Sequence, residues 1–169
     1  GADRNHWLIF ASGVEHANNI ASMLCTLGVE CRAVHSKMSD AERDEVIAQF
    51  KSGAIRAVVN NNVLTTGFDF PAIDLIVMLR PTSSTVLWVQ MLGRGTRPWE
   101  GKNNCLVLDF AGNTARLGPI NDPVIPRKKG DKVGEAPIRI CDCCQMYNHA
   151  SARFCGGQPF PTNEGCGAP

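Results

Sequence analysis

Long hydrophobic runs are missing from this sequence of 169 residues. No stretch approaches the ~18 apolar residues that cross a bilayer, and the opening residues, GADRNHWLIFAS, lack the basic stretch and apolar core of a signal peptide. We therefore expect an intracellular, cytoplasmic protein that does not bind a membrane. A large charge excess is missing as well: 17 basic residues against 16 acidic ones leave a formal net charge of +1, so any binding of phosphate groups has to be local.

The composition is that of a globular protein with one unusual feature, its cysteines. Hydrophobic residues make up 44% of the chain and charged residues 20%, and the length suits one domain of about 100–150 residues with a small appendage. Eight cysteines are present, and five of them fall within residues 141–166. The other three, Cys25, Cys31 and Cys105, lie in apolar or amphipathic segments, where a free thiol behaves as a small buried hydrophobe.

Short apolar segments alternate with segments of helical periodicity over residues 7–110. A capping box, Ser39 with Glu42, marks the start of the second helix. Such alternation predicts an α/β fold with a mainly parallel sheet, whose ligands bind at the carboxyl ends of the strands. We expect strands at 7–11, 31–35, 55–59, 75–79 and 105–110, and helices at 14–27, 39–50 and 82–92.

The amino-acid composition of the chain changes after Gly118. Prolines and basic residues dominate the next stretch, and the cysteine-rich tail follows it. Prolines at this density are typical of a linker or an extended arm. We therefore expect a domain over 1–118, a linker over 119–137 and a small module over 138–169.

Two arginines, Arg94 and Arg97, flank a glycine-containing turn in the segment QMLGRGTR. Glycine lets the backbone approach a ligand closely, and paired guanidinium groups suit the spread charge of a transferring phosphoryl group. From the residues alone, two solvated arginines after a helix are an equally good interpretation. A second candidate is the segment TTGFDFP at 65–71, where hydroxyl and amide groups can hold phosphate and the carboxylate of Asp69 can accept a hydrogen bond from ribose.

Four segments in this order, WLIFASGVEHANNIASML, HSKMSDAERDEVIAQFKSG, VVNNNVLTTGFDFP and QMLGRGTRP, resemble the second RecA-like lobe of superfamily 2 helicases and translocases of the DEAD/DEAH type. The resemblance covers residues 5–112. It implies a three-layer RecA-like domain that works as one lobe of an ATP-driven motor. The catalytic arginine fingers would be Arg94 and Arg97, and the ATP-binding residues would be Gly67, Asp69, Gln90 and Gly93, with Asp69 toward the ribose.

The same resemblance implies a track for one nucleic-acid strand, with DNA favoured over RNA. Its contacts to the strand's phosphates would come from Asn61, Asn62 and Thr65, and Ser12 and His35 would extend the track at two other strand ends. The run of three asparagines leaves open which of them faces phosphate.

The chain departs from this family in one respect, because no segment fits the phosphate loop G-x-x-x-x-G-K-[ST]. ATP and Mg²⁺ would therefore be bound only together with an N-terminal lobe of the same parent chain, and we expect this chain alone to be inactive as an ATPase. An alternative is an adaptor that binds nucleic acid or protein through its cysteine-rich tail and uses the α/β lobe as a scaffold. A small enzyme with its own nucleotide site is contradicted by the missing loop.

The tail carries the spacing of a structural zinc site. Cys141 and Cys144 form a C-x-x-C, and Cys155 and Cys166 each follow after ten intervening residues. Four thiolates can enclose a tetrahedral Zn²⁺, and a module too small for its own core gains stability from the metal. The pattern resembles a zinc ribbon with an insertion before the last ligand.

Three alternatives to this ligand set stay open at the level of sequence. Cys143 can replace Cys144, His149 can replace one thiolate, or the cysteines can form disulfides. Disulfides are disfavoured because the sequence carries no secretory signal.

The three tryptophans are expected to pack in the core. Trp7 and Trp88 occupy periodic positions of a strand and a helix. Trp99 follows the arginine segment, where stacking on a base or on adenine is the alternative to packing.

Overall fold

A computed structural model describes residues 3–64, 68–124, 138–156 and 166–168. The chain forms two compact units: the first comprises 1–81 and 90–111, and the second comprises 82–89 and 112–169. The predicted boundaries at 118 and 137 stay predictions.

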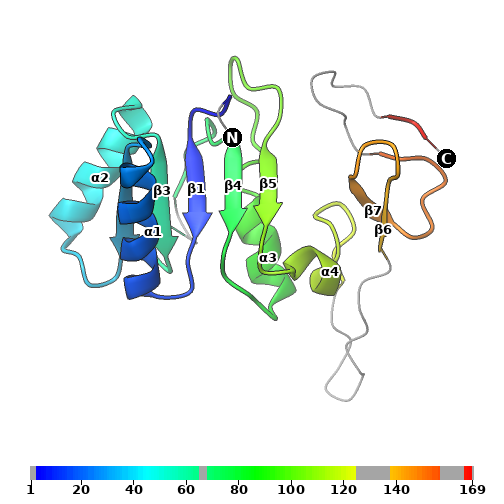
Figure 1. The fold of residues 1–169 in the computed structure, drawn as a ribbon, viewed down its shortest axis with the longest axis horizontal. Coiled ribbons are helices and arrows are strands. Elements are labelled where there is room, and N and C mark those ends of the chain that lie inside the picture. The colour runs from blue at the N-terminus through cyan, green and yellow to red at the C-terminus, as the bar shows by residue number, and fades with distance from the viewer. Residues whose placement is uncertain (1–2, 65–67, 125–137, 157–165, 169) are drawn as a thin grey trace. The chain divides into compact units, whose positions relative to one another are not determined.

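The first unit is built on a five-stranded parallel sheet of order β2-β3-β1-β4-β5 (Figure 1). The predicted α/β class is thereby confirmed, and each predicted strand and helix is present with ends shifted by a few residues. The elements of the first unit are β1 (Trp7–Phe10), α1 (Val14–Thr26), β2 (Cys31–His35), α2 (Asp40–Ser52), β3 (Ala57–Asn61), β4 (Leu75–Met78) and β5 (Leu106–Asp109). Helix α3 (Thr85–Leu92) has residues in both units.

Helix α1 covers one face of the sheet by packing on β2 and β3 (Figure 1). Its small residues Ala17 and Ala21 are buried against Ile9 and Val59 of the sheet. The chain moves from β1 outward to β2 and then back to β3. Because parallel crossovers are right-handed, this reversal puts α2 on the opposite face. Phe50 of α2 is fully buried there and makes an edge contact with Phe70, the ring centroids 5.3 Å apart.

The start of α2 confirms the predicted capping box. Ser39 Oγ accepts from the Glu42 backbone N–H at 3.3 Å, and a Glu42 carboxylate oxygen accepts from the Ser39 backbone N–H at 2.8 Å. Ser39 Oγ also donates to this carboxylate at 2.8 Å, and the two hydrogen bonds that the carboxylate accepts, from the Ser39 backbone N–H and from its hydroxyl, lower the pKa of Glu42. Gly53 ends the helix at φ 79°, a left-handed conformation that glycine adopts without steric cost.

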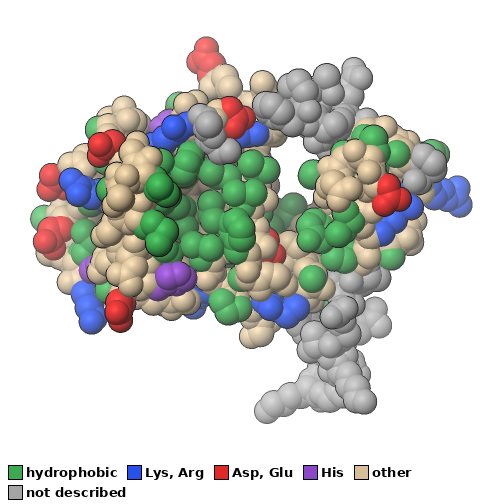
Figure 2. Space-filling model, viewed as in Figure 1, with side chains coloured by type: hydrophobic (Ala, Val, Ile, Leu, Met, Phe, Trp, Pro, Cys, Tyr) green, Lys and Arg blue, Asp and Glu red, His purple; other side chains and the backbone are tan. Residues whose placement is uncertain are grey.

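Some predicted core positions are exposed instead. Trp99 is 53% exposed, so the expectation that it packs in the core is wrong, and Cys25 also lies at the surface. The physical reason is that Trp99 lies in a turn beyond the end of α3, where the described part of the chain leaves its ring open to solvent. Figure 2 shows a further gathering of hydrophobic side chains beside α1, over β1, β4 and β5, where Leu79, Leu106 and Leu108 are partly buried.

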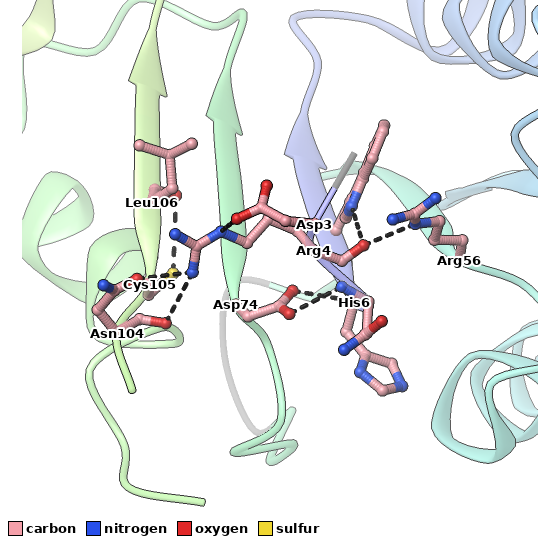
Figure 3. Close-up of polar contacts among 10 residues, drawn as sticks. Asp3, Arg4, His6, Arg56, Asp74, Asn104, Cys105 and Leu106 are labelled. Carbon is pink, nitrogen blue, oxygen red and sulfur yellow. Dashed lines mark hydrogen bonds and ion pairs between the residues drawn. The ribbon is translucent and has the colours of Figure 1, made fainter. Parts of the chain in front are cut away.

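A network of polar contacts holds the amino ends of the strands together (Figure 3). The carboxylate of Asp74, the residue before β4, accepts from the backbone N–H groups of Asn5 at 2.7 Å and His6 at 2.8 Å. Arg4 donates to the side-chain oxygen of Asn104 at 2.6 Å, and its carbonyl oxygen accepts from Arg56 Nε at 2.6 Å. The segment that leads into β1 is thus tied to β3, β4 and β5 at one edge of the sheet.

Replacing Asp74 with alanine is expected to lower the free energy of unfolding by about 2–5 kcal/mol, because two partly buried N–H groups lose their acceptor. Chemical denaturation followed by tryptophan fluorescence measures the change. Asp44→Ala, which removes an exposed carboxylate from α2, is the matched control and should shift the midpoint little. Equal midpoints for the two variants would contradict the assigned role of Asp74.

The second unit contains a short helix and a hairpin that the sequence did not predict. Helix α4 (Asn113–Leu117) follows Gly112, and β6 (Ile138–Ile140) pairs antiparallel with β7 (Tyr147–His149). Trp88 is buried as predicted, and its indole N–H donates to the carbonyl oxygen of Gly118 at 3.0 Å. Within the described ranges, no helix combines the length and the apolar character that a bilayer span requires.

Candidate functional site

The arginine segment and the segment before β4 meet at the amino ends of the strands. The guanidinium group of Arg97 forms an ion pair with the carboxylate of Asp69, and Arg94 donates to the backbone carbonyl of Phe68. The side chain of Arg97 is 41% exposed and that of Asp69 is 70% exposed. The structure therefore brings together three of the predicted nucleotide-site residues, and it leaves the ion pair open to solvent.

Burial affects the guanidinium group of Arg94. Burial lowers the pKa of Arg94, the nearby charge of Arg97 lowers it further, and Asp69 raises it. An arginine remains protonated through such a shift. Two guanidinium groups beside one carboxylate give this edge a local positive charge that the balanced composition of the chain does not reveal.

The turn between the arginines depends on close packing at Gly95. A Cβ atom there would meet the Sγ of Cys105 and would lie 2.9 Å from Cδ1 of Ile76. Only glycine fits this position, so the glycine brings the arginine turn against the start of β5. Gln90 is exposed near the end of α3, and Gly93 follows that helix directly. Gly67 lies outside the described residues.

The three consecutive asparagines have three different environments at the carboxyl end of β3. Asn60 Oδ1 accepts from the backbone N–H groups of Val63 at 3.1 Å and Leu64 at 2.9 Å. Asn61 is buried and donates from Nδ2 to the carbonyl oxygen of Ala11 at 3.1 Å. Asn62 is exposed, adopts a left-handed φ of 62°, and accepts a hydrogen bond from Arg80. Of the three, Asn62 is therefore the one whose side chain faces solvent.

The remaining residues of the predicted strand track also lie at carboxyl ends. Ser12 follows β1, is exposed, and its hydroxyl lies 2.9 Å from Nδ1 of His16. His35 ends β2, and its buried Nδ1 has no hydrogen-bond partner among the described residues. Thr65 lies outside the described ranges.

These two groups of residues occupy opposite edges of the sheet. Asn60 and Asn61 end β3 at the carboxyl edge, whereas Asp69 and Phe70 lie at the amino edge, where Phe70 contacts His6. Strands of four to five residues separate the edges by roughly 13–17 Å at ~3.3 Å per residue. The general rule that parallel sheets bind ligands at the carboxyl ends of their strands therefore does not describe the position of Asp69. The reason is that the connection from β3 to β4 has to return to the amino edge before β4 begins.

The cysteine tail forms a compact group of four sulfur atoms. The Sγ atoms of Cys141, Cys144, Cys155 and Cys166 all lie within 4.8 Å of one another. The Sγ atoms of Cys141 and Cys166 are 3.5 Å apart, and those of Cys144 and Cys155 are also 3.5 Å apart. Both distances are far longer than a disulfide bond. Cys143 is exposed and does not join the group, so it does not replace Cys144 in this structure. The side chain of His149 lies outside the described part.

Backbone and side-chain donors surround these sulfurs. The backbone N–H of Cys144 is the main cause that lowers the pKa of the Cys141 thiol to about 6. Asn148, which is buried, donates from Nδ2 to Sγ of Cys155 at 3.3 Å and to the carbonyl oxygen of Met146 at 3.0 Å, and its Oδ1 accepts from the Gly156 N–H at 3.0 Å. Asn148 thus fixes the position of one sulfur. The cysteine spacing predicts the four sulfur ligands, but it does not predict the role of Asn148.

Comparison with known proteins identifies relatives of the chain. Residues 2–98 match the family described as "Helicase conserved C-terminal domain". A protein of Schizosaccharomyces pombe named as a mitochondrial ATP-dependent helicase, irc3, is 38% identical over 132 residues, which cover 78% of this chain and 22% of that protein. The chain spans about a fifth of the length of the curated relatives it matches first.

Solved structures agree with this match. The Mycobacterium smegmatis helicase Lhr, in a structure bound to single-stranded DNA and AMP-PNP, has a TM-score of 0.57 at 28% identity over 69% of this chain and 16% of that one. The Escherichia coli DEAD-box protein SrmB has a TM-score of 0.59 at 18% identity over 71% of this chain and 70% of that one. The likeness to SrmB confirms the predicted RecA-like fold.

Proposed function

The chain belongs to the helicase conserved C-terminal domain family, and from this membership we propose that it is the second motor lobe of an ATP-dependent nucleic-acid helicase or translocase. The observation that carries the proposal is the solvent-open ion pair of Arg97 and Asp69, with Arg94 beside it. Such an arrangement is half of a nucleotide site. The other half, a phosphate loop and the acidic residues that hold Mg²⁺, would come from an N-terminal lobe of the same parent chain.

The ion pair accounts for how this edge accepts a nucleotide. An exposed pair contributes only about 0–1 kcal/mol to stability, so its partners separate at little cost. When ATP arrives on the first lobe, the ribose hydroxyl groups donate hydrogen bonds to Asp69. The triphosphate then pairs with the guanidinium groups of Arg97 and Arg94. A guanidinium group stabilises the charge that spreads over the transferring phosphoryl group. Binding in this way closes the two lobes, and release after hydrolysis reopens them.

The carboxyl edge supplies the contact to one nucleic-acid strand. Asn62 and Ser12 are exposed there, and Arg80 adds a positive charge next to Asn62. We assign Asn61 the role of holding the loop to β1, because its amide donates to Ala11. Direct phosphate contacts then come from Asn62, Ser12 and Thr65, with His35 at the margin. Separate edges for nucleotide and strand let lobe closure move the strand without obstructing the nucleotide. We also propose that the bound nucleic acid is DNA rather than RNA and that the protein is cytoplasmic.

The four sulfurs fit a structural Zn²⁺. A tetrahedral ion with Zn–S bonds of ~2.3 Å requires sulfur atoms roughly 3.8 Å apart, and the group here has pairs at 3.5 Å and no separation beyond 4.8 Å. Cys141, Cys144, Cys155 and Cys166 would hold the ion as thiolates. When bound, the ion would supply the cross-link that a module with so small a core lacks.

The chain by itself is expected to hydrolyse ATP no faster than buffer, because neither phosphate loop nor Mg²⁺ ligands accompany the arginines. A phosphate-release assay with single- and double-stranded DNA measures this, and the two-lobed parent protein is the positive control. Turnover by the purified 169-residue chain that disappears in its own Arg97→Ala variant would contradict the half-site proposal.

A further inference from the structure

One lysine near the arginine pair makes an unusual set of hydrogen bonds. Nζ of Lys102 donates to the carbonyl oxygen of Pro71 at 2.8 Å, to that of Gly95 at 2.8 Å and to that of Arg97 at 2.9 Å. The side chain is partly buried, and burial lowers its pKa. An ammonium group has three N–H donors, so all of them are engaged by backbone oxygens. No local motif of the sequence pointed to this residue.

The three acceptors come from the two segments that form the candidate nucleotide site. Pro71 lies two residues after Asp69, while Gly95 and Arg97 belong to the arginine turn. The lysine therefore ties the carboxylate-bearing segment to the arginine-bearing segment. Hydrogen bonds from a charged donor are roughly twice as strong as those between neutral groups, so this side chain reinforces the spacing that the Arg97–Asp69 and Arg94–Phe68 contacts also set.

A turn brings the lysine back to the arginines. The Lys102 backbone N–H donates to the Trp99 carbonyl oxygen at 3.0 Å, and Gly101 has a left-handed φ of 75°, as the third position of a type II turn requires. The chain reverses there and directs the side chain of Lys102 toward residues 95–97. The same turn leaves Trp99 exposed.

We propose that Lys102 is a positioning residue that holds Arg94 and Arg97 in the geometry needed to meet a triphosphate. The inference rests on the proposed function of the arginines. Without the lysine, the arginine turn keeps its contact at Gly95 and the side-chain bonds to Phe68 and Asp69, but it loses the backbone link to Pro71 that Nζ provides. The guanidinium groups then sample several positions, and a displacement of ~1 Å from productive geometry costs about a hundredfold in rate. Lys102 does not touch the nucleotide, so it affects catalysis only through the arginines.

The test uses Lys102→Met in the full two-lobed protein, because methionine keeps much of the side-chain volume and removes all three donors. The kcat for ATP hydrolysis is expected to fall about 10- to 100-fold, while KM for ATP changes less than about threefold, as for an interaction that matters only in the transition state. Lys102→Gln keeps two N–H donors, so its kcat should lie between that of the wild type and that of Lys102→Met. It also provides a second variant if the methionine form folds poorly. Arg32→Met removes an exposed cation from β2 and is the control, with kcat expected to stay unchanged.

A combined variant separates a positioning role from general destabilisation. If Lys102 acts through the two arginines, then adding Lys102→Met to a variant that already carries Arg94→Ala and Arg97→Ala does not slow it further, since residues that act as one unit are not additive. The role of Lys102 would be overturned if the kcat losses of the lysine and arginine variants multiplied in the combined variant. It would also be overturned if kcat were normal for Lys102→Met but much reduced for Arg97→Ala. Either result would leave the proposed function standing. A normal kcat for Arg97→Ala would overturn both.

Discussion

Arg97→Ala in the two-lobed protein is expected to lower kcat for ATP hydrolysis by about 10³- to 10⁵-fold, the loss typical of an arginine finger. The reason lies in the state of this side chain: it is 41% exposed, and its partner Asp69 is more exposed still. Its removal therefore takes away charge stabilisation of the transition state and leaves the core intact. Single-turnover hydrolysis with saturating ATP and nucleic acid measures the effect directly.

Two companion variants sharpen this prediction. Arg94→Ala should also reduce kcat, but it also removes the bond to the Phe68 carbonyl and is expected to loosen the segment before β4. Arg43→Ala, in α2, removes an arginine whose partner is the exposed Asp40 and should leave kcat near the wild-type value. A kcat within about threefold of wild type for Arg97→Ala would contradict the assignment, because a finger contributes far more than that.

Removing the proposed zinc ion is expected to unfold the cysteine module, since metal binding by such small units supplies roughly 10–16 kcal/mol of folding free energy. Cys144→Ser takes away one of the four clustered sulfurs, and the purified variant should contain almost no zinc. Zinc content by elemental analysis and amide protection of residues 138–156 by hydrogen exchange report the loss. A strong chelator added to the wild-type chain should give the same exchange pattern.

The adjacent cysteine provides the matched control. Cys143 is exposed and lies outside the sulfur group, so Cys143→Ser should keep about one zinc per chain, as a four-thiolate site predicts. Equal loss in the two variants would contradict the ligand set, and so would full zinc content in Cys144→Ser. Neither variant is expected to change the stability of the sheet domain, whose core contains none of these residues.

Local patterns in the sequence determined much of this protein. The alternation of apolar runs with helical periodicity predicts the five strands of the parallel sheet and helices α1, α2 and α3, and Ser39 with Glu42 marks the start of α2. The spacing of Cys141, Cys144, Cys155 and Cys166 predicts the sulfur group that the structure shows. These features are predictable because each depends on residues close together in the chain, or on a cysteine spacing typical of metal sites.

Only the tertiary structure decided how the functional residues are distributed. It placed Asp69 at the edge opposite to Asn62, gave Asn60 and Asn61 internal partners, and brought Lys102 to Pro71 across 31 positions of sequence. Such contacts arise where the chain returns to a sheet edge, and nothing in the local pattern records which distant carbonyl a lysine will meet. The sequence thus determined which groups are available, and packing of the connections around the sheet decided which of them share a site.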